Sequence, residues 1–180
     1  MLTITVPATE FWDEIHEEFI YKKEQTLQLE HSLVSLSKWE SKWEKAFFGR
    51  QEKTTEEVID YVRCMTLTQH VDPEVYTRLT NENYKQINDY INAPMSATHF
   101  AEDKKAAPGR ETVTSELIYY WMIAFNIPVE FQKWHINRLL TLIRICNIKN
   151  NPPKKRSGRD LMSRNAALNA ARRNRAHSKG

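Results

Sequence analysis

Histidine and cysteine are the residues of this chain best able to hold a metal ion or to act as acid, base or nucleophile. Their spacing favours none of these roles. No two histidines stand in an HxxxH arrangement, and no Cys or His pair has the short spacing of a zinc site. The four glycines form neither a GxGxxG nor a GK[ST] phosphate-binding loop. The histidines are at positions 16, 31, 70, 99, 135 and 177, and the cysteines are at 64 and 146.

From these patterns we expect no metal, no cofactor and no catalytic residue, and we predict that the protein is not an enzyme. His135 lies in the longest apolar stretch of the chain, where a core histidine is favoured over a general base. Catalytic triads assemble in space, so a search of the sequence does not find them. Cys64 and Cys146 lie on apolar faces without a CxxC partner, which is typical of a reducing compartment. The N-terminus shows no basic region followed by an apolar run, and a cytoplasmic protein is expected.

Charge is distributed unevenly along the chain. From Pro152 onward there are nine Lys or Arg residues and one acid, Asp160, whereas the first 151 residues carry 17 basic and 22 acidic side chains. We therefore predict two parts: a mainly helical globular domain over residues 1–151 with an N-terminal β-hairpin, and a basic tail over 152–180 that is flexible or conditionally helical. The tail is the predicted partner-binding segment, through Lys154, Lys155, Arg156, Arg159, Arg164, Leu168, Arg172, Arg173 and Arg175.

The repeated sequence KWESKWEK, residues 38–45, combines aromatic and basic residues and has two interpretations. One is a nucleic-acid surface, in which bases stack on tryptophan. The other is a pair of core tryptophans, Trp39 and Trp43, one helical turn apart with a solvated charged face. The helical spacing of Leu36, Trp39, Trp43 and Phe47 favours the core interpretation.

The remaining elements follow from periodicity and caps. Residues 2–6 alternate as a short strand, and Phe19, Tyr21, Leu27 and Leu29 predict a hairpin about a turn at 22–25. A helix capped by Ser32 or Ser35 is expected to end at Gly49. Thr54 and Glu57 form a capping-box pattern before a second helix, and two short helices follow near 73–79 and 81–91.

The longest apolar region is 115–147, which predicts two buried helices with Pro128 in the first turn of the second. A membrane hairpin is excluded because charged residues interrupt the run and neither half has the ~20 apolar residues needed to span a bilayer. The fold class predicted from all these elements is mostly α (α+β): a single helical domain with a small N-terminal antiparallel β element and a basic C-terminal tail.

Several stretches resemble a known class of phage proteins. They are WESKWEKAFFG, TTEEVIDYVRCMTL, MSATHF, the 115–147 region and the basic Ala/Arg/Asn tail. The chain is similar to tail assembly chaperone-like proteins of tailed phages and prophages over Leu2–Asn150, most specifically over 32–50 and 115–147. The resemblance implies an assembly factor in the host cytoplasm that binds the tape measure protein and helps to recruit tail tube subunits. It supplies no catalytic residues, and it leaves open both an oligomer and a place in the virion.

A second class of function stays open from the sequence. A virion structural, connector or packaging protein could bind nucleic acid non-specifically through the same basic tail, because phosphates attract Lys and Arg. The tail interleaves no aromatic residues that would stack on bases. A gel shift at two salt concentrations, beside a pull-down with the tape measure protein, separates the two classes.

Overall fold

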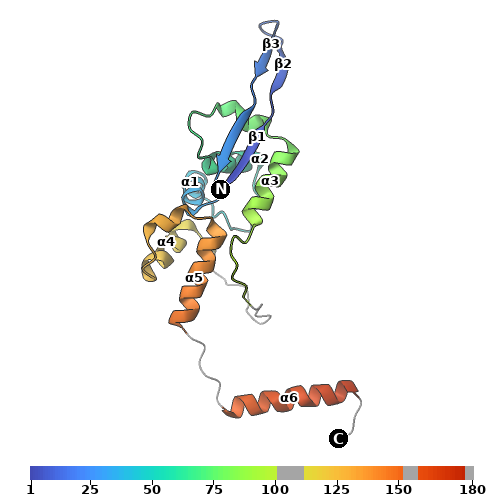
Figure 1. Ribbon diagram of the computed structural model, residues 1–180, viewed down its shortest axis with the longest axis vertical. Coiled ribbons are helices and arrows are strands. Elements are labelled where there is room, and N and C mark those ends of the chain that lie inside the picture. The colour runs from blue at the N-terminus through green and yellow to red at the C-terminus, as the bar shows by residue number, and fades with distance from the viewer. Residues whose placement is uncertain (101–111, 152–157, 177–180) are drawn as a thin grey trace. The chain divides into compact units, whose positions relative to one another are not determined.

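The computed structural model is mostly helical with a small antiparallel β element near the N-terminus, which confirms the predicted α+β fold class (Figure 1). It describes residues 1–100, 112–151 and 158–176. The contacts within the chain divide it into two compact units, Met1–Cys146 and Asn147–Gly180, and each is described by itself. The predicted boundary between residues 151 and 152 stays a prediction.

Two antiparallel strand pairs form the β element. Strand β1 (Leu2–Val6) pairs with β4 (Gln25–Leu29), and β2 (Thr9–Asp13) pairs with β3 (Glu18–Lys22). In the first pair, Ile4 lies opposite Leu27. Alternate residues of β1 and β4 are buried against the helices, as the period of two in a strand requires (Ile4, Val6, Leu27 and Leu29).

The turn predicted at residues 22–25 is wrong. That segment joins β3 to β4, and the chain instead reverses at residues 14–17, between β2 and β3. Asp13 organises this turn, since its Oδ1 accepts a hydrogen bond of 2.9 Å from the backbone N–H of Ile15. Glu17 completes it with a positive φ of 53°. The hairpin therefore closes through an Asx-type turn at Asp13 and does not use the Asn-Gly pair that is typical of tight hairpins.

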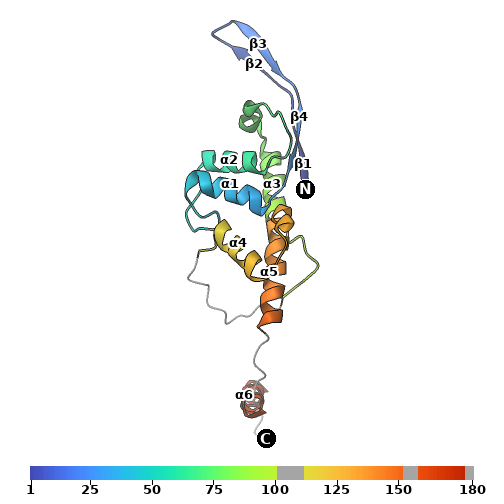
Figure 2. The same ribbon diagram turned by 90° about the vertical axis from the view of Figure 1, so that its left-hand side faces the viewer.

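Helices α1 (Leu33–Trp43) and α2 (Thr55–Met65) run side by side (Figure 2). Ser32 caps α1 and Thr54 caps α2, each in a capping box, so both predicted helix starts are confirmed. Helix α1 ends earlier than predicted, because Glu44 adopts a left-handed φ of 51° and its N–H bonds to the carbonyl of Glu40.

Two further elements complete the first core cluster. They are the 3-10 helix η1 (Pro73–Arg78), capped by Asp72, and helix α3 (Asn81–Asn92), capped by Thr80. The cluster joins the inward face of β1 and β4 to apolar and aromatic residues of α1, α2, η1 and α3. Trp39 is its largest fully buried side chain, which confirms the core interpretation of this residue.

The second core cluster lies between α1, α4 (Ser115–Ala124) and α5 (Ile136–Asn150). The second helix of the 115–147 region does not begin at Pro128. That proline precedes the short 3-10 helix η2 (Val129–Lys133), and α5 starts only at Ile136. Between them, Trp134 stacks on Phe131 with ring centroids 4.0 Å apart. The buried-helix prediction is only half right, because Ile118 and Met122 are the buried apolar residues of α4.

The second unit contains the end of α5 and helix α6 (Gly158–Ala176), within the predicted basic tail. Nowhere in the described ranges is a helix both long enough and apolar enough to cross a membrane.

Candidate functional site

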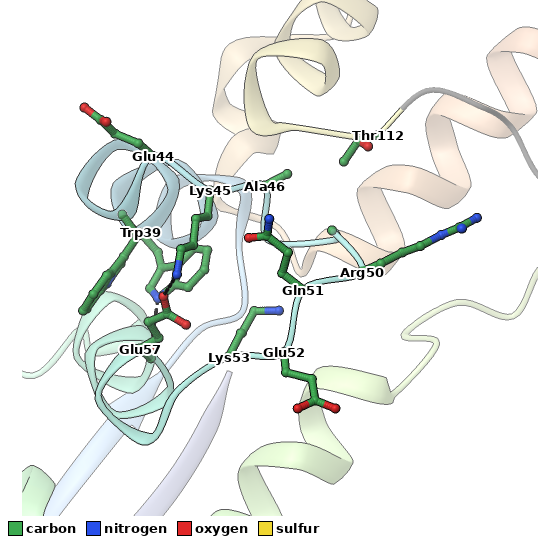
Figure 3. Close-up of a pocket in the computed structure, with 12 residues that line it drawn as sticks. Trp39, Glu44, Lys45, Ala46, Arg50, Gln51, Glu52, Lys53, Glu57 and Thr112 are labelled. Atoms are coloured by element: carbon green, nitrogen blue, oxygen red, sulfur yellow. Dashed lines mark hydrogen bonds and ion pairs between the residues drawn. The ribbon is translucent and has the colours of Figure 1, made fainter.

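A surface depression of about 560 Å³ lies beside α1 and the loop that follows it (Figure 3). Charged and polar residues of 44–53 line it, together with Trp39, Trp43, Glu57 and Thr112. Figure 3 shows Lys45 reaching toward the carboxylate of Glu57. The pKa of Glu57 is lowered, mainly by the hydrogen bond from Lys45. The hydrogen bond from the backbone N–H of Thr54 lowers it further.

The charges of this depression serve the fold. Lys53 donates a 2.7 Å hydrogen bond to the carbonyl of Phe47, and its Nζ lies 4.4 Å from the centre of the Phe47 ring. Burial lowers the pKa of Lys53. The described residues that line the depression include no Ser or Cys that could serve as a nucleophile and no His that could serve as a base. The depression therefore lies at a helix-to-loop junction whose charged side chains take part in contacts of the fold.

Two buried histidines form the second candidate. His31 Nδ1 is hydrogen-bonded to the hydroxyl of Tyr61, and the His31 and His135 rings lie 5.1 Å apart between centroids. His135 Nε2 lies 3.0 Å from the carbonyl oxygen of Tyr90, which can only accept a hydrogen bond. The N–H of Asn137 donates to His135 Nδ1 at 3.3 Å. These two partners hold His135 as a neutral ring with its proton on Nε2.

Both histidines are therefore structural. Burial, and to a lesser degree the nearby His135, lower the pKa of His31 to about 3, and burial also lowers the pKa of His135. Both nitrogens of His135 are used by the backbone, so it could act as a base only by breaking bonds of the fold. The interpretation of His135 as a core histidine is confirmed by its 6% exposure.

The neutral histidines predict that stability falls in mild acid. Unfolding raises the pKa of His31 from about 3 to its ordinary value near 6.5, so the unfolded chain binds more protons between these values. Lowering the pH from 7 to 5 should reduce the free energy of unfolding by about 2 kcal/mol through His31 alone. His135 acts in the same direction. Urea denaturation at the two pH values measures the change.

His31→Gln should flatten this pH dependence, whereas His70→Gln, at an exposed position, should leave it unchanged. The buried carboxylates affect the free energy of unfolding at lower pH than the histidines do. Burial would raise the pKa of Asp60, but hydrogen bonds from Lys42 and Trp43 lower it, so its contribution is lost only below its ordinary pKa. Equal or greater stability at pH 5 would show that these histidines are not held neutral.

The third candidate is the outer face of α4, which we define as Tyr120, Ile123 and Ala124, all of them exposed. The buried residues Ser115, Ile118 and Met122 form the opposite stripe of the helix. Ile123 is 76% exposed and Tyr120 63% exposed. A helix that is apolar on all sides is normally buried on all sides. A contiguous exposed apolar face on such a helix makes it a candidate interaction surface.

The fourth candidate is the β2–β3 hairpin, residues 9–22, which we call the hairpin arm. In both views β2 and β3 extend away from the helices of the first unit (Figures 1 and 2). Sequence reasoning missed this surface because it predicted the turn at residues 22–25 and paired Phe19 and Tyr21 with the strand that follows. The available signal was the presence of aromatic residues in both halves of the segment, Phe11 and Trp12 before Asp13 and Phe19 and Tyr21 after it. The exposed large apolar residues of the hairpin arm are Phe11, Trp12, Ile15, Phe19 and Tyr21.

The predicted partner-binding residues of the basic tail fall into three groups. Lys154, Lys155 and Arg156 lie outside the described residues. Arg159 and Arg164 lie within the range of α6. Leu168, Arg172, Arg173 and Arg175 are exposed on α6, with the three arginines near its C-terminal end. Partner binding by this group stays a prediction.

In the part of the chain that the structure describes, His, Cys, Asp and Glu side chains nowhere gather in a group of three that could hold a metal ion. No protein-family model, curated protein or solved structure matches the chain.

Proposed function

We propose that this chain is a non-enzymatic protein-binding factor of tailed-phage assembly. It acts as a tail assembly chaperone that binds the tape measure protein in the host cytoplasm and helps to recruit tail tube subunits. The observation that carries the proposal is the outer face of α4, where Ile123 is 76% exposed on a helix with almost no polar residues. The resemblance over Leu2–Asn150 supports the choice of partner.

The outer face of α4 suits a helical partner. Tyr120, Ile123 and Ala124 lie within three and four residues of one another, so they share one exposed face of the helix. A tape measure protein is long and helical, and its apolar stripes need cover before the tail is built. Two apolar helical stripes can pack by ridges into grooves, which keeps the partner's stripe out of water.

The arginines of α6 supply a second, electrostatic contribution. Arg172 and Arg175 are exposed and lie near the C-terminal end of the helix. We expect Arg172→Glu with Arg175→Glu to weaken tape measure binding about tenfold at 50 mM salt. The loss should be smaller at 500 mM, where the Debye length is only a few ångströms. Biolayer interferometry at both salt concentrations measures this.

Lys38→Glu with Lys85→Glu makes the same change of net charge at exposed positions of α1 and α3, and it should leave the affinity unchanged. If both pairs of substitutions weaken binding equally, only net charge matters, and α6 has no specific role in binding the tape measure protein.

The second candidate function is non-specific nucleic-acid binding, as a connector or packaging protein. The observation that favours it is the exposed cluster of Arg172, Arg173 and Arg175 on α6. Two assays with the full chain separate the functions. Co-expression with the tape measure protein should raise the soluble fraction of that protein and give a complex that survives purification. A gel shift of duplex DNA at 150 mM salt without any effect on the tape measure protein would support the second function instead.

A further inference from the structure

The hairpin arm carries apolar side chains that belong to neither core cluster of the described residues. Trp12 pairs with Phe19, with an edge-to-face contact at 4.8 Å between ring centroids. Glu10 pairs with Tyr21, so Trp12, Phe19, Tyr21 and Glu10 share one face of the hairpin. Phe19 is 67% exposed and Tyr21 62% exposed. A two-stranded hairpin of this kind is marginally stable by itself, so a binding partner would stabilise it.

The hairpin arm is also acidic. Five carboxylates lie between Thr9 and Lys22, and Lys22 is its single Lys or Arg residue. Lys22 is already neutralised, since its Nζ lies 2.6 Å from Glu74 and 3.7 Å from Asp72 outside the arm. Asp13 is occupied within the turn, where it pairs with His16. Within the described residues no cation lies at ion-pair distance from the other four: Glu10, Glu14, Glu17 and Glu18.

Helix α6 has the complementary character. Its range holds five arginines and one aspartate. Leu168, Arg172 and Arg175 follow at spacings of four and three residues, so they share a face, and all three are exposed. The 19 residues of α6 extend about 28 Å at the helical rise, which exceeds the roughly 17 Å of a five-residue strand. One such helix can therefore cover the length of the hairpin face with an apolar side chain and two cations.

Other occupants of the hairpin arm fit less well. Pairing of two arms edge to edge would bring like charges together, which destabilises cross-strand contacts. A nucleic acid or an anionic lipid surface would be repelled by the carboxylates. We infer that the acidic aromatic hairpin arm of one copy binds the basic helix α6 of a second copy. This contact gives α6 an acidic partner and makes the protein a self-associating one, independently of the outer face of α4.

Sedimentation velocity of the full chain tests this inference. At 50 mM salt we expect dimers or larger species, since one arm and one helix per copy permit either reciprocal pairing or open chains. At 500 mM salt the protein should be monomeric. Trp12→Ser with Phe19→Ser should weaken self-association at least about tenfold, and Arg172→Glu with Arg175→Glu should do the same. Lys38→Glu with Lys85→Glu, the matched charge control, should not.

A charge exchange gives the sharpest result. The Glu10→Arg variant and the Arg172→Glu variant should each self-associate more weakly alone, since Glu10 is the carboxylate that shares the face of Trp12 and Phe19. Together in one chain they should restore association, because the opposite charges then meet again. Circular dichroism must show that every variant keeps its helical content. Ile123→Ser should still self-associate, so failure of this inference and failure of the proposed function are distinguishable. A full chain that stays monomeric at 50 mM salt, or restores nothing in the charge exchange, overturns the inference.

Discussion

Trp39→Ala is expected to cause the largest loss of stability of any single substitution considered for this chain, about 3–5 kcal/mol. The side chain is 1% exposed, and its Nε1 donates a hydrogen bond of 2.8 Å to the carbonyl of Glu57. Its ring also meets Phe47 edge to face, with centroids 5.4 Å apart. The substitution would leave a cavity between α1 and α2 and remove this side-chain hydrogen bond between the two helices. Urea denaturation followed by far-UV circular dichroism measures the loss.

Trp12→Ala is the matched control, because Trp12 lies on the hairpin arm and is 48% exposed. It should change the free energy of unfolding by less than about 1 kcal/mol. If the two tryptophans prove equally tolerant of replacement, the buried position of Trp39 in the first core cluster is wrong.

Glu40→Ala is expected to cost about 3 kcal/mol, because two backbone donors would lose a charged acceptor. Glu40 Oε1 accepts a 2.7 Å hydrogen bond from the N–H of Phe47, and Oε2 accepts one of 2.7 Å from the N–H of Ser115. This buried carboxylate thus joins α1 to the following loop and to the start of α4. Thermal and urea denaturation measure the effect.

Glu40→Gln should cost less than the alanine substitution, since its amide keeps one acceptor oxygen while its NH₂ group would face a donor. Glu52→Ala, at an exposed loop position, serves as the control and should be close to neutral. A neutral Glu40→Ala would mean that water replaces the carboxylate at both N–H groups.

Local signals predicted the helices of this fold well. Ser32, Thr54 and Thr80 cap helices through hydrogen bonds that depend only on residues three positions away. The stripe containing Leu36 and Trp39 likewise identified the buried side of α1. These features are set within one or two helical turns, so a single sequence contains the information for them.

The hairpin and the 115–147 region were harder, because their outcome depends on contacts between distant segments. Strand β3 pairs with β2 rather than with β4, a choice that alternation alone cannot make. Apolar composition indicated that α4 should be buried on all sides, but Tyr120 and Ile123 remain largely exposed in the structure. The same limit hid the contact between His31 and Tyr61, which lie 30 residues apart in the sequence.

The surfaces that carry the proposals therefore come from tertiary structure. The outer face of α4 is visible only once its buried side is known, and the hairpin arm only once its true turn is known. The basic tail, in contrast, was evident from charge alone. Both proposals use the arginines of α6, which lies in this tail. These arginines can bind an acidic partner protein or the hairpin arm of a second copy.

The affinity of the full chain for the tape measure protein of the same phage tests the central claim most directly. It should be measured for the unaltered chain, for Tyr120→Ser with Ile123→Ser, and for Leu67→Ser, a control at another exposed apolar residue that is 55% exposed. We expect the α4 variant to bind at least about tenfold more weakly. Leu67→Ser should bind as the unaltered chain does. Equal affinity of all three proteins, or no binding by the unaltered chain, would contradict the account.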